Sequence, residues 1–131
     1  MTLSEINDDL LATFFKHGFR IHPNYIGSDN KIHALKQWPS RAASNMEELG
    51  KLVEEASKSG EVQRFGVVPP EHCMIVDLDV RDGKMGLQNY EDLVKTHGIT
   101  ATPLFQVKSK SGGFHLYFKT VSKFVKTVSN V

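Results

Sequence analysis

Two carboxylates stand at alternate positions in an apolar segment near the middle of the chain. The segment runs from Met74 to Val80, and its acids are Asp77 and Asp79. Because the side chains of a strand alternate between faces, both acids would point the same way, with their Cα atoms roughly 6.6 Å apart. Two such carboxylates can converge on one or two divalent cations, and hard cations such as Mg²⁺ prefer oxygen ligands. The spacing predicts a strand with one buried apolar side and one acidic side open to a ligand.

A second polar group alternates with apolar residues close to the C-terminus. His115, Tyr117 and Lys119 share one predicted strand face, and the segment follows a glycine pair, Gly112 and Gly113. The glycines suit a tight hairpin turn and let backbone N–H groups approach a phosphate. Taken singly, each feature is more often structural: a solvated acid pair, a surface histidine, a turn. Together, on one open face, they favour a nucleoside triphosphate site with a bridging metal.

Helices and antiparallel strands must position these residues. Apolar periodicity predicts a first helix that opens at the capping-box pattern of 2–5 and stops at Gly18, and a strand at 19–22 ended by Pro23. The stretch 24–43 has no period and is predicted to be a loop. A helix should open at the capping box of 44–47 and end at Gly60, and Gly98 should cap a third helix. The remaining predictions are strands at 64–68, 73–80, 104–109 and 114–118 and the third helix at 85–97. This order indicates an α+β fold with a largely antiparallel sheet.

Length and composition are those of an ordinary globular protein. The 131 residues, with 40% apolar and 24% charged residues, fit one domain spanning 1–131. The lone Cys73 excludes an internal disulfide and, with no apolar run of membrane-spanning length, indicates a cytoplasmic protein. From residue 104 onward there are five lysines and no acid, so positive charge gathers in the last third.

The order of these motifs resembles a known family. The run from Val76 to Asp79, followed some thirty residues on by Ser111-Gly112-Gly113-Phe114-His115-Leu116-Tyr117-Phe118, is similar to the N-terminal primase-polymerase (prim-pol) domain of bifunctional replication proteins from phages and plasmids, in the archaeo-eukaryotic primase superfamily. The similarity covers about residues 10–120. Upstream features support it: Gly18-Phe19 before Pro23, a basic loop with Lys31, Lys36 and Trp38, the helix opening at 42–47, and Phe65-Gly66-Val67.

The resemblance implies an RRM-like sheet with helices packed on one face and an open polar face, which performs template-directed nucleotidyl transfer with Mg²⁺ or Mn²⁺. Asp77 and Asp79 match the family's metal-binding pair, and His115 would orient or neutralise phosphate. Ser111, Gly112 and Gly113, with Lys108 and Lys110 just before them, match the region that contacts the incoming triphosphate. The implied partners are a DNA template, nucleoside triphosphates and a C-terminal helicase or other replication domain.

One part of the family pattern is missing. The family supplies a third metal-binding acid on a later strand, whereas no Asp or Glu follows His115 here, and Asp82 is a poor substitute. We therefore expect a fragment truncated before its third metal-binding motif, with weakened metal affinity.

Two other functions use the same residues. A non-catalytic single-strand-binding replication domain would rely on the lysine-rich last third and on exposed aromatics such as Trp38 and Tyr117. A metal-dependent nuclease would use Asp77 and Asp79 with water as the nucleophile. Lys31, Lys36 and Trp38 are either nucleic-acid contacts or ordinary loop residues.

Overall fold

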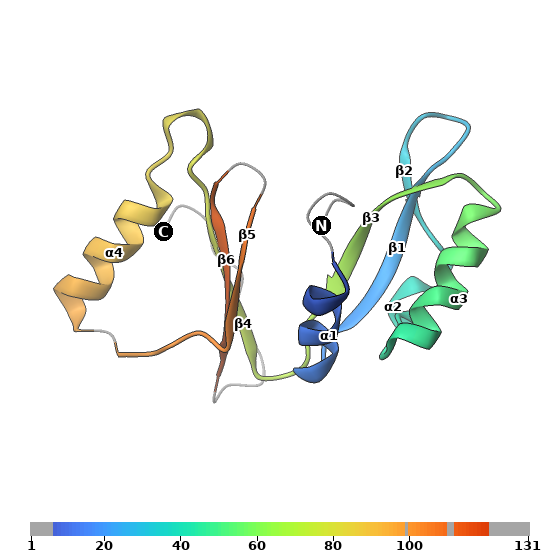
Figure 1. The fold of residues 1–131 in the computed structure, drawn as a ribbon. Coiled ribbons are helices and arrows are strands. Elements are labelled where there is room, and N and C mark those ends of the chain that lie inside the picture. The colour runs from blue at the N-terminus through green and yellow to red at the C-terminus, as the bar shows by residue number, and fades with distance from the viewer. Residues whose placement is uncertain (1–6, 99, 110–111, 121–131) are drawn as a thin grey trace. The chain divides into compact units, whose positions relative to one another are not determined.

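The computed structural model describes residues 7–98, 100–109 and 112–120. The chain divides into two compact units, Met1–Pro70 and Glu71–Val131. Each unit holds one three-stranded sheet, and every pairing in both sheets is antiparallel (Figure 1). The predicted α+β class is confirmed, although the strands form two sheets. Among the described residues no helix is long and apolar enough to cross a membrane.

The first unit packs its helices against a sheet with the strand order β2-β1-β3. Apolar side chains from both helices and strands form its core, including Phe14, Phe19, Ile21 and Leu49. The rings of Phe14 and Phe19 meet edge to face, with their centroids 5.3 Å apart. In chain order its elements are α1 (Asp8–Lys16), β1 (Arg20–Ile26), β2 (Ile32–Ala34), α2 (Trp38–Arg41), α3 (Met46–Ser57) and β3 (Glu61–Val68).

Side-chain caps fix where the two longer helices of this unit begin. The Asn7 side chain accepts a hydrogen bond from Leu10 N at 2.8 Å and starts α1, while the capping box predicted at 2–5 lies outside the described residues. Asn45 caps α3 by accepting from Glu48 N at 2.9 Å, and the Glu48 carboxylate accepts in return from Ser44 N at 3.2 Å. The N-cap therefore lies one residue later than predicted, and Glu48 bonds the residue before the cap, a variant of the predicted capping box.

The prediction that Pro23 ends the first strand was wrong, because β1 continues to Ile26. Ile21 exchanges backbone hydrogen bonds with Ala43 on the side away from β3. Pro23 stands two residues after Ile21, so its nitrogen also points away from β3. On that side, β2 begins to pair with β1 only at Asn24. The missing N–H of proline thus removes no ladder hydrogen bond. The predicted loop at 24–43 likewise contains the end of β1, the short β2 and α2.

The second unit places one helix, α4, over one face of a sheet with the strand order β4-β6-β5 (Figure 1). Leu78, Leu116 and Phe118 are buried, and Leu87 and Tyr90 of α4 pack against them. Gly98 ends α4 in a left-handed conformation with φ 59°, as predicted for its C-cap. The elements of this unit are β4 (Cys73–Leu78), η2 (Arg81–Gly83), α4 (Gly86–His97), β5 (Phe105–Lys108) and β6 (Phe114–Lys119). β3 and β4, adjacent in sequence, belong to different sheets.

Candidate metal and nucleotide site

Asp77 on the edge strand β4 and His115 on the central strand β6 lie directly opposite each other in the second unit. They are register partners in the antiparallel β4–β6 ladder, and His115 Nε2 is 3.4 Å from Asp77 Oδ1. Paired residues of a ladder share a sheet face, here the face opposite α4. The Asp77 side chain is 71% exposed and that of His115 is 40% exposed, so a ligand can reach both.

Asp79 lies just past the end of β4, and its carboxylate binds two cationic side chains. Asp79 Oδ1 accepts from Arg81 N at 2.9 Å and Arg81 Nε at 3.2 Å. Asp79 Oδ2 accepts from Arg81 Nη2 at 3.1 Å and Lys84 Nζ at 3.3 Å. The hydrogen bonds from Arg81, followed by that from Lys84, hold the pKa of Asp79 well below its usual range. Asp79 is therefore ionised at neutral pH, and only 24% of its side chain is exposed.

A tight turn brings both cations back to Asp79. Asp82 and Gly83 adopt left-handed conformations with φ 53° and φ 75°, and Lys84 N donates to Arg81 O at 2.9 Å. Left-handed backbone costs little at glycine and is tolerated by aspartate. The chain reverses within this turn, and Gly86 N then donates to Asp79 O at 3.0 Å.

Two glycines fix the backbone between the carboxylates. A methyl group on Gly113 would lie 2.2 Å from Leu78 O, and one on Gly86 would lie 2.7 Å from both the nitrogen and the oxygen of Asp79. Such distances are far below van der Waals contact, so only glycine lets the hairpin and the start of α4 approach this closely. The position of Asp79 therefore depends on packing around the end of β4.

The sheet face that carries Asp77 and His115 is partly aromatic. The rings of Phe105 and Tyr117 stack with centroids 4.5 Å apart and an interplanar angle of 9°. Tyr117 is buried, which raises the pKa of its hydroxyl to about 12. The interpretation of Tyr117 as an exposed base-stacking aromatic was therefore wrong, because its ring packs on Phe105 within the sheet.

The predicted phosphate-binding residues are distributed around the β5–β6 hairpin. Gly112 has φ 91° and donates from its nitrogen to Ser109 O at 3.0 Å, so a tight turn is present. Ser111 and Lys110 lie outside the described residues. Lys108 pairs with Phe114, on the α4 side of the sheet, whereas Lys119 pairs with Cys73 on the side of His115.

The carboxylates suit a hard cation without completing its ligand shell. Within the described part of the chain, no three His, Cys, Asp or Glu residues gather to hold one ion, so Asp82 does not supply a third acid. Mg²⁺ commonly binds through one or two carboxylates together with water and substrate phosphates. Asp77 offers an exposed carboxylate of this kind, whereas the carboxylate of Asp79 is occupied by Arg81 and Lys84.

The predicted nucleic-acid contacts belong to the first unit. Lys31 and Lys36 are exposed, and Trp38 begins α2. The Trp38 ring stacks on the buried His22 ring of β1, with centroids 4.3 Å apart, and stays 37% exposed. Trp38 is thus anchored on the sheet and still offers aromatic surface.

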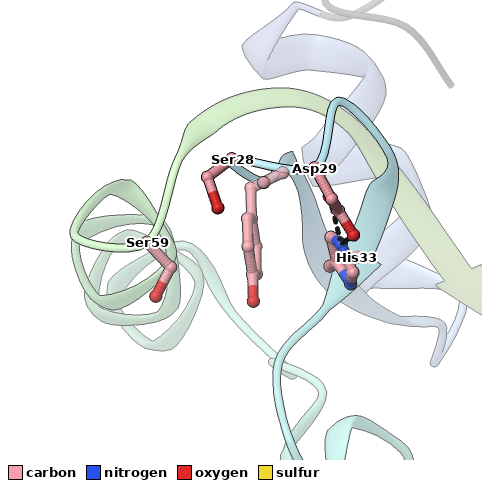
Figure 2. A pocket seen from close by; sticks show the side chains of 6 residues that line it. Ser28, Asp29, His33 and Ser59 are labelled. Carbon is pink, nitrogen blue, oxygen red and sulfur yellow. Dashed lines mark hydrogen bonds and ion pairs between the residues drawn. The ribbon is translucent and has the colours of Figure 1, made fainter.

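A pocket of about 290 Å³ also lies in the first unit, beside the β1–β2 hairpin (Figure 2). Asp29 Oδ1 accepts from Lys31 N at 3.1 Å, and His33 Nε2 lies 2.8 Å from the same oxygen. The His33 hydrogen bond, with that from Lys31 N, lowers the pKa of Asp29. These contacts are those of an Asx turn that closes the hairpin, so we assign the pocket no ligand.

Sequence reasoning overlooked Arg81 and Lys84. The signal was present in Asp79-Val80-Arg81-Asp82-Gly83-Lys84, where an Asp-Gly turn separates two cations that follow an acid. Turn chemistry of this kind predicts that the chain reverses and returns both cations to the carboxylate.

Comparison with known proteins identifies the family to which the chain belongs. The family model for the N-terminal domain of bifunctional DNA primase/polymerases (Prim-Pol) matches residues 11–130. The chain therefore belongs to the Prim-Pol family, as its motifs indicated. No curated protein and no solved structure gives a significant match. Family membership identifies a primase/polymerase-type domain with DNA and nucleoside triphosphates as its substrate classes.

Proposed function

We propose that the chain performs template-directed nucleotidyl transfer at the face of β4 and β6. The observation that carries this proposal is the direct pairing of Asp77 with His115 across β4 and β6. Asp79 follows Asp77 by two residues, and the chain belongs to the Prim-Pol family. Since the family model extends through both units, we also propose that residues 1–131 act as one functional domain.

Asp77 and Asp79 would hold a divalent ion, Mg²⁺ or Mn²⁺, in this site. When bound, the ion supplies charge stabilisation to the attacking hydroxyl and to the leaving pyrophosphate. Asp77 contributes an accessible carboxylate, while the close approach of Gly86 and Gly113 sets where the backbone of Asp79 lies. A third acid, which the family places on a later strand, would complete the site in a longer protein.

The imidazole and the hairpin would bind the triphosphate. His115, 40% exposed beside Asp77, can donate a hydrogen bond to a phosphate oxygen and, when protonated, neutralise part of its charge. Gly112 and Gly113 allow the backbone to approach phosphate closely, and Ser111 and Lys110 are proposed as further contacts. The side chain of Lys108 leaves the sheet on the opposite face, so it must extend past the edge of the hairpin to contact a phosphate.

The first unit would contribute contacts to the DNA template. The exposed ring of Trp38 can stack on a base, and Lys31 and Lys36 can neutralise phosphates. We further propose that the parent is a phage or plasmid replication protein in which a helicase or another replication domain follows.

A non-catalytic single-strand-binding domain is the second candidate. It is favoured by the two cations on Asp79, which leave this carboxylate neutralised. Such a domain would bind single strands in a salt-sensitive way that ignores both metal and Asp77.

An incorporation assay separates these functions. A primed DNA template, deoxynucleoside triphosphates and Mn²⁺ are incubated with the wild-type chain, the Asp77→Asn variant and an Asp92→Asn control on the exposed side of α4. We expect primer extension by the wild type and the control, and none by Asp77→Asn. Extension that survives Asp77→Asn would contradict the proposal.

Two further outcomes point elsewhere. Metal-independent binding of single strands without extension would favour the second candidate. Metal-dependent degradation of DNA in the absence of nucleotides would indicate a nuclease that uses the same carboxylates.

A further inference from the structure

The acceptor capacity of Asp79 is fully used by its own loop. An ionised carboxylate offers about four lone-pair sites on its two oxygens. Arg81 occupies three of them through its backbone nitrogen, Nε and Nη2, and Lys84 Nζ occupies the fourth. A metal ion therefore cannot bind Asp79 without displacing at least one of these donors. Asp77, by contrast, keeps 71% of its side chain exposed.

Arg81 and Lys84 neutralise most of the negative charge around this pair of acids. Asp77, Asp79 and Asp82 contribute −3, and Arg81 and Lys84 contribute +2, so the segment 77–84 keeps a net charge of only −1. A bare divalent cation is therefore attracted much more weakly than three unpaired carboxylates would attract it. A metal-bound triphosphate is different, because its excess negative charge can bind the two cations once they leave Asp79.

Both cations are free to make this exchange. The side chains of Arg81 and Lys84 are 64% and 63% exposed, so moving either away from Asp79 disrupts no buried packing. The left-handed turn at Asp82 and Gly83 keeps the two residues close to the carboxylate throughout.

We propose that Arg81 and Lys84 form a counter-ion clamp on Asp79 that a divalent cation must displace, and that the released side chains then bind the phosphates of the metal-bound nucleoside triphosphate. The inference rests on the proposed function, because it takes metal and triphosphate as the ligands of this face. It makes metal and nucleotide binding cooperative: metal alone competes with the clamp, whereas metal with triphosphate gives the clamp a new partner.

Calorimetry with Mn²⁺ alone tests the first half. The wild type is compared with the Arg81→Gln, Lys84→Gln double variant, and far-UV circular dichroism confirms that both are folded. The double variant should bind Mn²⁺ on the order of tenfold more tightly, because two competing cations are gone. A Lys51→Gln, Lys95→Gln variant removes the same charge from exposed helix positions and should bind like the wild type.

Calorimetry with a non-hydrolysable triphosphate and Mn²⁺ tests the second half, and the sign should reverse. The clamp variant should now bind on the order of tenfold more weakly, because its phosphate contacts are lost. If the two residues had only a structural role, the double variant would not bind Mn²⁺ more tightly and the triphosphate more weakly.

The remaining outcomes separate this inference from the proposed function. If Mn²⁺ binding depends on Asp77 but is equal in the wild type and the clamp variant, the clamp is wrong and the metal site stands. If the clamp variant binds Mn²⁺ more tightly but binds the triphosphate as the wild type does, Arg81 and Lys84 do not bind the phosphates, and the second half of the proposal is wrong. If neither protein binds Mn²⁺, both the clamp and the proposed metal site are contradicted.

Discussion

Substituting Gly113 with alanine should loosen the end of β4 and displace Asp79. The new methyl group would lie 2.2 Å from Leu78 O and 3.3 Å from Ser109 Oγ. The serine side chain can rotate, but the carbonyl belongs to a strand that pairs with β6 through the same region. Relief therefore requires the hairpin to move away from β4. Overpacking of this kind costs about 2–3 kcal/mol.

Gly83→Ala provides a matched control in the same unit. Gly83 has φ 75°, but nothing lies within 4 Å of the position where a methyl group would stand. This substitution introduces backbone strain without a collision and should cost only about 1 kcal/mol. Comparing the two variants therefore separates the close approach of two backbones from the general effect of replacing glycine.

Amide hydrogen exchange read by mass spectrometry measures the effect where it occurs. In peptides covering β4 and β6, Gly113→Ala should accelerate exchange about 30- to 150-fold, the equivalent of the 2–3 kcal/mol loss in opening free energy. Gly83→Ala should accelerate it about fivefold. Equal exchange in the two variants would refute the reasoning that the hairpin and β4 fit only through a glycine.

Three further predictions concern the first unit. Burial lowers the pKa of His22, so its contribution to stability is present above the ordinary pKa of about 6.5 and is lost as the pH falls below it. The urea midpoint, read from Trp38 fluorescence, should therefore drop between about pH 7.5 and about pH 5, and His22→Phe should reduce the drop; an identical drop in the variant would contradict this. Asn45→Ala should destabilise the unit by about 1 kcal/mol in urea unfolding, because Glu48 N loses its cap, and an unchanged midpoint would show that the cap contributes nothing. Trp38→Ala should weaken single-stranded DNA binding by about 1–3 kcal/mol in a titration of fluorescently labelled DNA, and Trp38→Phe should recover part of the loss. Equal affinity in the alanine variant would show that Trp38 does not contact the DNA.

Much of the second unit follows from local alternation. The period of two along β4 and β6 correctly predicts which residues face α4, because a strand exposes its side chains alternately and only one set is free of charged residues. That rule brings Leu78 and Leu116 into the core and puts Asp77 with His115 on the other face. Gly98 likewise follows from the left-handed C-cap that a helix end favours.

The features that sequence reasoning missed depend on tertiary partners. Alternation does not say which strands pair, so it could not show that β3 and β4 belong to different sheets. Pro23 lies within a strand because its nitrogen faces a side without a ladder partner, which is a property of the assembled sheet. The clamp on Asp79 depends on a left-handed Asp82, a conformation that aspartate adopts only in some turns.

The central claim is that the face of β4 and β6 binds a metal-bound nucleotide through Asp77 and Asp79. It is tested most directly by calorimetric titration of a nucleoside triphosphate with Mn²⁺ into the wild-type chain and into the Asp77→Ala, Asp79→Ala double variant. We predict binding that requires Mn²⁺ and is lost in the double variant. A folded wild type that does not bind, or a double variant that binds equally well, would contradict the claim.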